Sequence, residues 1–360
     1  MNWFWFAIIA LLCWSGSDFF SKLGCRDNRD KYSQFKMVIA VGLVMGVHAL
    51  IEIIGGVEIS WQVILTYLPV SLLYIGSMAL GYAGLRYIEL SISSPICNAS
   101  GALVAILAII TGTSGEMEVP QYLAVALACA GVIGLGFVEA HEDEDLRSAR
   151  QEASNYKYAK SWLALALPIA YCILDAAGTF ADDLVLEVFH MDYIRASVAP
   201  EFAALFAEEI PEFLMDAEVA FSPEFLATYT EEQGLFLREF VSEMSDASAN
   251  SANVAYELTF LAAGVVCFLY TCVFKKQKLV AKAEGPKYMG AIFETIGQFT
   301  YIFALADGDH VAMAAPIISS YCMASVLWSR LFLKEKLSWK HYACIAVTFA
   351  GILIMGIYDM

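Results

Sequence analysis

The chain has 360 residues, of which 59% are apolar and only 16% are charged, and its mean hydropathy is +0.62. A water-soluble domain of this length has no interior large enough for so much apolar surface, so the composition excludes a soluble protein. The net charge of −17 is concentrated between residues 182 and 253, which hold sixteen acidic and two basic residues. The rest of the chain is therefore nearly neutral.

Apolar runs of about 20 residues recur along the chain, and each is long enough to cross a hydrocarbon core of about 30 Å as a helix. Helices satisfy their own backbone hydrogen bonds inside lipid. Stretches such as Ala102–Ile110 lack the alternation of a membrane β-strand. The sequence predicts an all-α membrane protein with ten transmembrane helices, near residues 3–23, 35–54, 63–84, 92–111, 120–138, 161–181, 254–274, 287–306, 311–332 and 341–358.

The segment 182–253, between the sixth and seventh predicted spans, is too long for an ordinary turn and forms an acidic insertion. Two helix-start patterns, Ser222-Pro223 and Thr230-x-x-Gln233, predict that this insertion is a mostly helical cap. The stretch Ser245–Asn253 is rich in Ser, Ala and Asn, so we expect it to be a flexible tether.

Lys and Arg lie almost entirely in the odd-numbered loops, which hold nineteen of the 21. The two exceptions, Arg195 and Arg238, lie in the insertion. Cytoplasmic loops normally carry the excess of Lys and Arg. We therefore expect a multi-pass plasma-membrane protein with a cytoplasmic linker at 139–160 and with both termini and the 182–253 insertion outside.

The two halves of the chain share an ordered set of motifs. Ser94-Pro95-Ile96 opens span four and Ala315-Pro316-Ile317 lies early in span nine. Later, Ala130-Gly131-Val132-Ile133 matches Ala350-Gly351-Ile352-Leu353. Matched order and spacing indicate a duplication. Because five spans per half is an odd number, the second copy enters the membrane from the opposite side, which predicts two inverted five-helix repeats. These repeats are residues 1–138, and residues 161–181 together with 254–358.

These residues resemble the EamA-type carriers of the drug/metabolite transporter superfamily, whose halves end in a Pro-led span, an acidic connection and a Gly-containing last span. Trp14-Ser15-Gly16 is similar to the opening helix of that family, and Ser325–Gly356 is the most similar stretch. The resemblance implies a ten-helix carrier of small metabolites, such as amino acids. Inverted halves typically hold the substrate near the midplane and work by alternating access.

Carboxylates inside the predicted spans are candidate solute or coupling sites, because inserting each costs roughly 2.5–3.5 kcal/mol. Glu294 lies well inside span eight, and Gln298 follows one turn later on the same face. This pair could bind a solute amine or a proton, or Glu294 could simply join helices by hydrogen bonds. Asp18 and Asp175 lie late in the first span of each half. We expect them near opposite faces, lining two vestibules or reaching headgroups.

Other polar groups in spans three, four, eight and nine could orient a substrate, although many such groups only join helices. These candidates are Tyr74, Tyr82, Asn98, Ser100, Tyr301, Ser319, Ser320 and Tyr321. The motif Gly42-x-x-x-Gly46 in span two predicts close helix packing rather than a site.

No catalytic constellation appears, and the nine cysteines show no ligand spacing or disulfide framework. We therefore expect no enzyme activity, metal, cofactor or nucleic-acid partner. The expected partners are a small solute, the lipid bilayer and a coupling ion such as the proton, and a homodimer is left open. Two alternatives also stay open: a receptor or regulated assembly whose acidic outer cap binds a partner or divalent cations, and a divalent-cation carrier.

Overall fold

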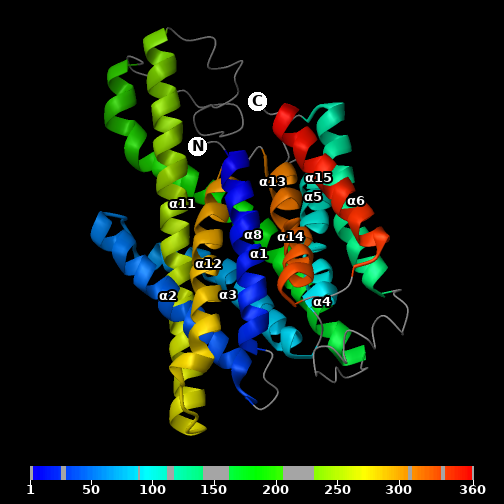
Figure 1. The fold of residues 1–360 in the computed structure, drawn as a ribbon. Coiled ribbons are helices and arrows are strands. Elements are labelled where there is room, and N and C mark those ends of the chain that lie inside the picture. The colour runs from blue at the N-terminus through cyan, green and yellow to red at the C-terminus, as the bar shows by residue number, and fades with distance from the viewer. Residues whose placement is uncertain are drawn as a thin grey trace.

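The computed structural model describes residues 3–25, 30–87, 90–111, 117–140, 162–205, 231–306, 310–333 and 337–358. Within these ranges the chain is helical apart from short turns and connections, which confirms the all-α prediction for them. The helices lie side by side, and both chain ends lie at the same end of the bundle (Figure 1). The predicted linker at 139–160 lies outside the described residues except for the last two residues of its preceding helix.

The first half of the chain provides six helical segments: α1 (Trp3–Cys25), α2 (Ser33–Gly55), α3 (Trp61–Tyr87), α4 (Leu90–Cys97), α5 (Ser100–Thr111) and α6 (Val119–Ala140). The second half provides α8 (Trp162–Leu205), α11 (Glu231–Phe268), the π-helical turn η2 (Leu269–Phe274), α12 (Ala281–Leu305), α13 (Val311–Ser319), α14 (Tyr321–Trp328), the π-helical turn η3 (Ser329–Leu333) and α15 (Trp339–Tyr358).

Eight helical stretches of the described residues are long and apolar enough to cross a membrane. They are Trp3–Cys25, Ser33–Gly55, Trp61–Leu85, Ser93–Thr111, Val119–Val138, Ser242–Phe274, Val311–Phe332 and Trp339–Tyr358. The helices α8 and α12, predicted as spans six and eight, are not among these eight. Helix α12 differs in composition because it carries Lys282, Glu284, Lys287 and Glu294.

The fourth and ninth predicted spans are each broken near the middle, whereas the sequence predicted continuous helices. Helix α4 contains Pro95 and ends at Cys97, and a turn at Asn98 precedes α5. Helix α13 contains Pro316, and the turn at Ser320 separates it from α14. Both breaks lie within about one turn of a proline, the residue at which helices most often kink or end.

The acidic insertion is built differently from the predicted cap. Helix α8 runs without a break past residue 181 to Leu205, and α11 begins at Glu231, one residue after the predicted start at Thr230. The predicted tether Ser245–Asn253 is wrong, because this stretch lies inside α11. Its Ser248, Ala249 and Ala252 are buried, so the small residues pack against neighbouring helices. The start predicted at Ser222-Pro223 lies outside the described residues.

Helices of one half pack mainly against helices of the other. Helix α1 packs along α12, and α3 packs along α8; in the same way α2 contacts α12, and α11 contacts α3. Helices α2 and α11 pack against each other, as do α6 and α15, and α5 and α13. The two halves are therefore interleaved and do not form two separate bundles.

Glycines allow the closest of these contacts. A Cβ on Gly42 would lie 2.6 Å from the carbonyl oxygen of Phe260 and 3.1 Å from the Cα of Gly264, so α2 and α11 approach each other backbone to backbone. A Cβ on Gly351 would lie 2.7 Å from the carbonyl oxygen of Ala124. The packing role predicted for the Gly42 motif is confirmed.

A buried polar contact also holds α2 to α11. The carboxylate of Glu257 is fully buried, and its two oxygens lie 2.8 and 2.9 Å from Nδ1 of His48. The other ring nitrogen of His48 lies 3.6 Å from Glu52. The histidine therefore bridges a buried and a more exposed carboxylate.

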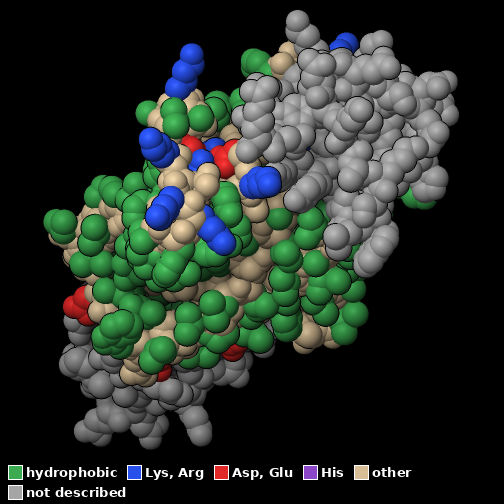
Figure 2. Space-filling view, turned by 90° about the horizontal axis from the view of Figure 1, so that it is seen from below, with side chains coloured by type: hydrophobic (Ala, Val, Ile, Leu, Met, Phe, Trp, Pro, Cys, Tyr) green, Lys and Arg blue, Asp and Glu red, His purple; other side chains and the backbone are tan. Residues whose placement is uncertain are grey.

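Basic side chains gather at one end of the bundle, where the sequence predicted the cytoplasmic loops. Figure 2 looks onto this end from below and shows Lys and Arg side chains that stand out among apolar ones. The exposed basic residues at this end are Lys31, Lys275, Lys276, Lys278, Lys282, Arg330 and Lys340. The apolar sides suit contact with lipid tails.

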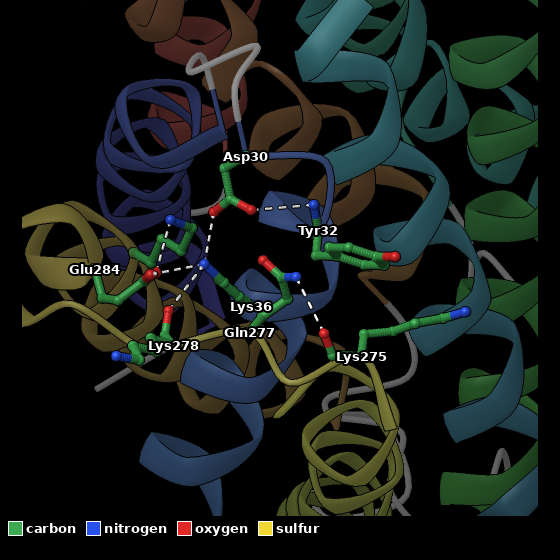
Figure 3. Close-up of polar contacts among 8 residues, drawn as sticks. Asp30, Tyr32, Lys36, Lys275, Gln277, Lys278 and Glu284 are labelled. Carbon is green, nitrogen blue, oxygen red and sulfur yellow. Dashed lines mark hydrogen bonds and ion pairs between the residues drawn. The ribbon is translucent and has the colours of Figure 1, made fainter. Parts of the chain in front are cut away.

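A set of buried ion pairs lies within this end, and we call it the basal ion cluster: Asp30, Lys36, Glu284 and Lys287 (Figure 3). The Nζ of Lys36 lies 2.9 Å from Asp30 and 3.4 Å from Glu284. The Nζ of Lys287 lies 2.7 Å from the other oxygen of Glu284. These contacts join the start of α2 to the first turns of α12.

Candidate functional site

A cavity with about 910 Å³ of atom-free space, its open part included, lies where the two halves of the chain meet. Helices α1, α3, α4 and α5 line it from the first half, and α8, α11, α12, α13 and α14 line it from the second. The broken spans help to form it, because Asn98, Ser319 and Tyr321 at the two breaks are all lining residues.

Glu294 lines this cavity from the middle of α12 and is buried. The hydroxyl of Ser17 on α1 donates a hydrogen bond of 2.6 Å to its Oε2. Residue Gly16 allows this close approach of α1 and α12, because a Cβ there would lie 3.1 Å from the ring of Phe293. The indole of Trp14 also lines the cavity. The Trp14-Ser15-Gly16 motif thus places α1 against the helix that carries the carboxyl group.

Asp18 and Asp175 line the same cavity as Glu294. The expectation that they lie near opposite faces is therefore wrong. Helix α8 continues for 30 residues beyond Asp175, so this residue is far from a helix end. Ser94 donates to Asp18 over 2.5 Å, and Ser100 donates to Asp175 over 2.7 Å. The two serines flank the break between α4 and α5, which therefore orients both carboxyl groups.

The charged side chains that line the cavity are all acidic. Its three ionisable carboxyl groups are Glu294, Asp18 and Asp175, and none of the residues that line it is a Lys or an Arg. Aromatic rings surround these groups: Trp14, Tyr74, Tyr82, Tyr171, Tyr256, Tyr301 and Tyr321. Carboxylates and aromatic faces both attract cations. The cavity is therefore chemically suited to a solute that carries a positive charge.

The remaining candidates from the sequence divide into two groups. Gln298, Tyr74, Tyr301 and Asn98 line the cavity, and the side-chain nitrogen of Gln298 is buried without a hydrogen-bond partner. Ser320 does not line it, because its hydroxyl donates to the carbonyl oxygen of Pro316 over 2.6 Å within the break. Its neighbours on either side are the lining residues.

The sequence analysis missed Asp182 on α8, a fully buried carboxyl group next to the cavity. The hydroxyl of Tyr67 donates to its Oδ1 over 2.7 Å, and that of Tyr74 donates to its Oδ2 over 3.2 Å. The residue stood at the first position of the predicted insertion, where an acid looks like part of a solvated surface. Recognition that the helix continues would have revealed it.

Metal binding finds no support in the described ranges, where no group of three or more His, Cys, Asp and Glu side chains is arranged to hold an ion. The cysteines in these ranges are all free thiols.

Comparison with known protein families finds one match, which covers the C-terminal part of the chain. The model of the EamA-like transporter family matches residues 247–357, from within α11 to the last turn of α15. No curated protein matches the chain. The match contains Glu294, Gln298 and Tyr301, and with them all of the second-half lining residues except those on α8. Residues 247–357 are therefore similar to the EamA-like transporter family, which is part of the drug/metabolite transporter superfamily.

Proposed function

We propose that the protein is a secondary transporter that moves a small, amine-bearing metabolite, such as an amino acid, across the plasma membrane by alternating access. The cavity carries this proposal, because it combines three carboxyl groups with an aromatic lining and no Lys or Arg. An amine bound there would compensate carboxylates that are otherwise costly inside a membrane. Glu294 is the central ligand, and Gln298 offers a free donor for a carboxylate or carbonyl of the same solute.

The arrangement of the helices supports ten spans in two inverted five-helix repeats. If α1, α2 and α3 correspond to α8, α11 and α12, then the contact of α1 with α12 corresponds to that of α8 with α3. Likewise the contact of α2 with α12 corresponds to that of α11 with α3. The broken spans after Pro95 and Pro316 are a second pair of equivalents. Such a pairing suits alternating access, because exchanging the conformations of the halves opens the other side.

The basic end of the bundle supports the proposed orientation. Its exposed Lys and Arg suit the cytoplasmic side. In the proposed orientation both termini and the described parts of the insertion lie outside. Residues 182–205 and 231–253 of the insertion are then extracytoplasmic extensions of α8 and α11.

Flux measurements in proteoliposomes test the proposal, with radiolabelled lysine, alanine and glutamate as probes of different charge. We expect wild-type protein to transport lysine or alanine better than glutamate. Glu294→Gln keeps the shape of the side chain and removes its charge, and we expect it to reduce flux at least tenfold while the protein still inserts and folds. Glu58→Gln is the control, because Glu58 lies in the connection between α2 and α3, outside the cavity lining. Unchanged flux in Glu294→Gln would contradict the role of Glu294.

A further inference from the structure

A second buried polar site lies beside the solute cavity, and we call it the Asp182 hydroxyl cluster: Asp182, Tyr67, Tyr74, Thr179 and Tyr301. Besides the two bonds to Asp182, the hydroxyl of Tyr301 donates to Oγ1 of Thr179 over 2.9 Å and contacts the hydroxyl of Tyr74. The cluster therefore connects α3, α8 and α12 through four hydroxyl groups and the carboxyl group of Asp182.

One end of the cluster faces the cavity and the other is closed. Tyr74, Thr179 and Tyr301 are lining residues of the cavity, but Asp182 and Tyr67 are not, and both of these are 0% exposed. On α3, Tyr67 lies two turns before Tyr74, towards the end of the bundle that carries the insertion. The hydroxyls of Tyr301 and Tyr74 thus form a path from the cavity to a carboxyl group that the solute does not contact.

The groups around Asp182 leave its charge uncompensated. Tyr67 and Tyr74 face it from α3, Tyr301 from α12, and Asp183 adjoins it on α8. From α11, the ring of Tyr256 packs edge-on against Tyr74, with 5.9 Å between ring centres. Among the residues of known position, no Lys, Arg or His lies within ion-pair distance of Asp182. A buried carboxylate without a cation is costly, and binding one cation would remove that cost.

The geometry favours a proton over a metal ion as that cation. The oxygens of the cluster already contact one another at hydrogen-bond distances of 2.7 to 3.3 Å, so hydrogen atoms occupy the space between them. A sodium or calcium ion would need these oxygens to separate and surround it.

We propose that Asp182 is the proton-binding site of this transporter, separate from the carboxyl groups that bind the solute. Hydronium in the cavity gives a proton to the hydroxyl oxygen of Tyr74 while that hydroxyl gives its own proton to Oδ2 of Asp182. One O–H bond breaks and one forms at Tyr74, hydronium becomes water, and the carboxylate becomes a neutral acid. Proton binding stands on the cluster alone, whereas its coupling to solute movement rests on the proposed function.

Protonation changes how α3 is attached to α8. The carboxylate accepts from Tyr67 and Tyr74 at once, but the neutral acid has an O–H that must donate. One of the two tyrosine bonds is therefore lost or reversed. Because α3 and α8 belong to different halves of the chain, the proton alters a contact that the halves share.

Infrared difference spectroscopy of the full chain in nanodiscs, titrated with acid and without solute, tests proton binding directly. We expect the wild type to show a carboxylic-acid carbonyl band that Asp182→Asn lacks and that the matched control Asp183→Asn keeps. Tyr67→Phe keeps the carboxyl group but removes a donor, so we expect it to move both the frequency and the titration midpoint of that band. If Asp182→Asn shows the same titrating bands as the wild type, or if Tyr67→Phe leaves them all unmoved, the proposal is wrong.

Proteoliposomes then test coupling, with lysine as the probe. We expect a pH gradient to drive lysine accumulation in the wild type and in Asp183→Asn. In Asp182→Asn the ratio of gradient-driven accumulation to equilibrium exchange is expected to fall at least tenfold. In Glu294→Gln we expect accumulation and exchange to fall together, so that their ratio stays the same. An unchanged ratio in Asp182→Asn, or a requirement for sodium, would overturn the coupling role. If the wild type moves no probe, the proposed function fails, and the infrared titration still decides whether Asp182 binds a proton.

Discussion

The basal ion cluster gives a stability prediction for Lys287→Met. Lys287 and Glu284 form an ion pair of 2.7 Å, and their side chains are only 2% and 5% exposed. Removing one partner of a buried pair costs about 3–5 kcal/mol, because the other charge stays buried. Lys36 remains 3.4 Å from Glu284 and compensates part of this charge, so we expect a loss near the lower limit, about 3 kcal/mol.

Thermal unfolding of the full chain in nanodiscs, followed by tryptophan fluorescence, measures this loss. With an unfolding entropy of about 2.1 cal/mol/K per residue, 1 kcal/mol corresponds to about 1.3 °C in a chain of 360 residues, so Lys287→Met is expected to lower the unfolding temperature by roughly 4 °C. Methionine keeps the aliphatic stem, which packs against Gly24. Lys282→Met on the same helix is the control, because Lys282 is exposed and its loss is expected to cost less than about 0.5 kcal/mol.

A double variant separates the effect of the unpaired charge on stability from the effect of altered packing. Glu284→Leu combined with Lys287→Met removes both charges, and Lys36 keeps Asp30 at 2.9 Å. A buried pair replaced by apolar groups of similar size is often neutral, so the double variant is expected to recover most of the loss. Equal unfolding temperatures for Lys287→Met and Lys282→Met would refute this reasoning.

Three further predictions use the same unfolding measurement. Gly42→Val is expected to lose about 1–3 kcal/mol, because its Cβ alone would lie 2.6 Å from a carbonyl oxygen of α11, whereas Gly55→Ala, with no atom within 4 Å of its Cβ, is expected to be neutral or stabilising. His48→Ala is expected to cost about 1–3 kcal/mol, because it leaves the buried Glu257 carboxylate without its 2.8 Å partner; a wild-type unfolding temperature would argue against this contact. Burial lowers the pKa of His190, in the extension of α8 beyond residue 181, to about 4. The unfolded chain therefore binds this proton more tightly, and stability is expected to fall as pH drops from about 6.5 towards 4, less so in His190→Gln.

Much of the fold could be predicted because apolar runs report membrane insertion directly. Helices α1, α2 and α15 begin and end within a few residues of the predicted spans. Glu294 was recognisable for the same reason, since a lone carboxyl group stands out in an apolar run. The shared cavity of Asp18 and Asp175 was not predictable, because it depends on how α1 and α8 pack on the broken span between them.

The errors in the insertion have a common cause. The stretch Ser245–Asn253 has the composition of a linker, but its small residues are also those that allow helices to pack closely inside a membrane protein. Asp182 was overlooked because the span was ended at the first pair of acids. Both errors come from reading polarity as exposure, and only the packing of α8 and α11 shows that these residues are buried.

The helices α8 and α11 form two long extensions on the side of the chain ends (Figure 1). Helix α8 extends for 24 residues beyond position 181, or about 36 Å at 1.5 Å per residue. A tilt of about 10° at the membrane would move the tip of such an extension by roughly 6 Å. Under the proposed function and orientation, small rearrangements around the cavity are magnified at the tip of this extension, where an attached probe reports them without touching the solute site.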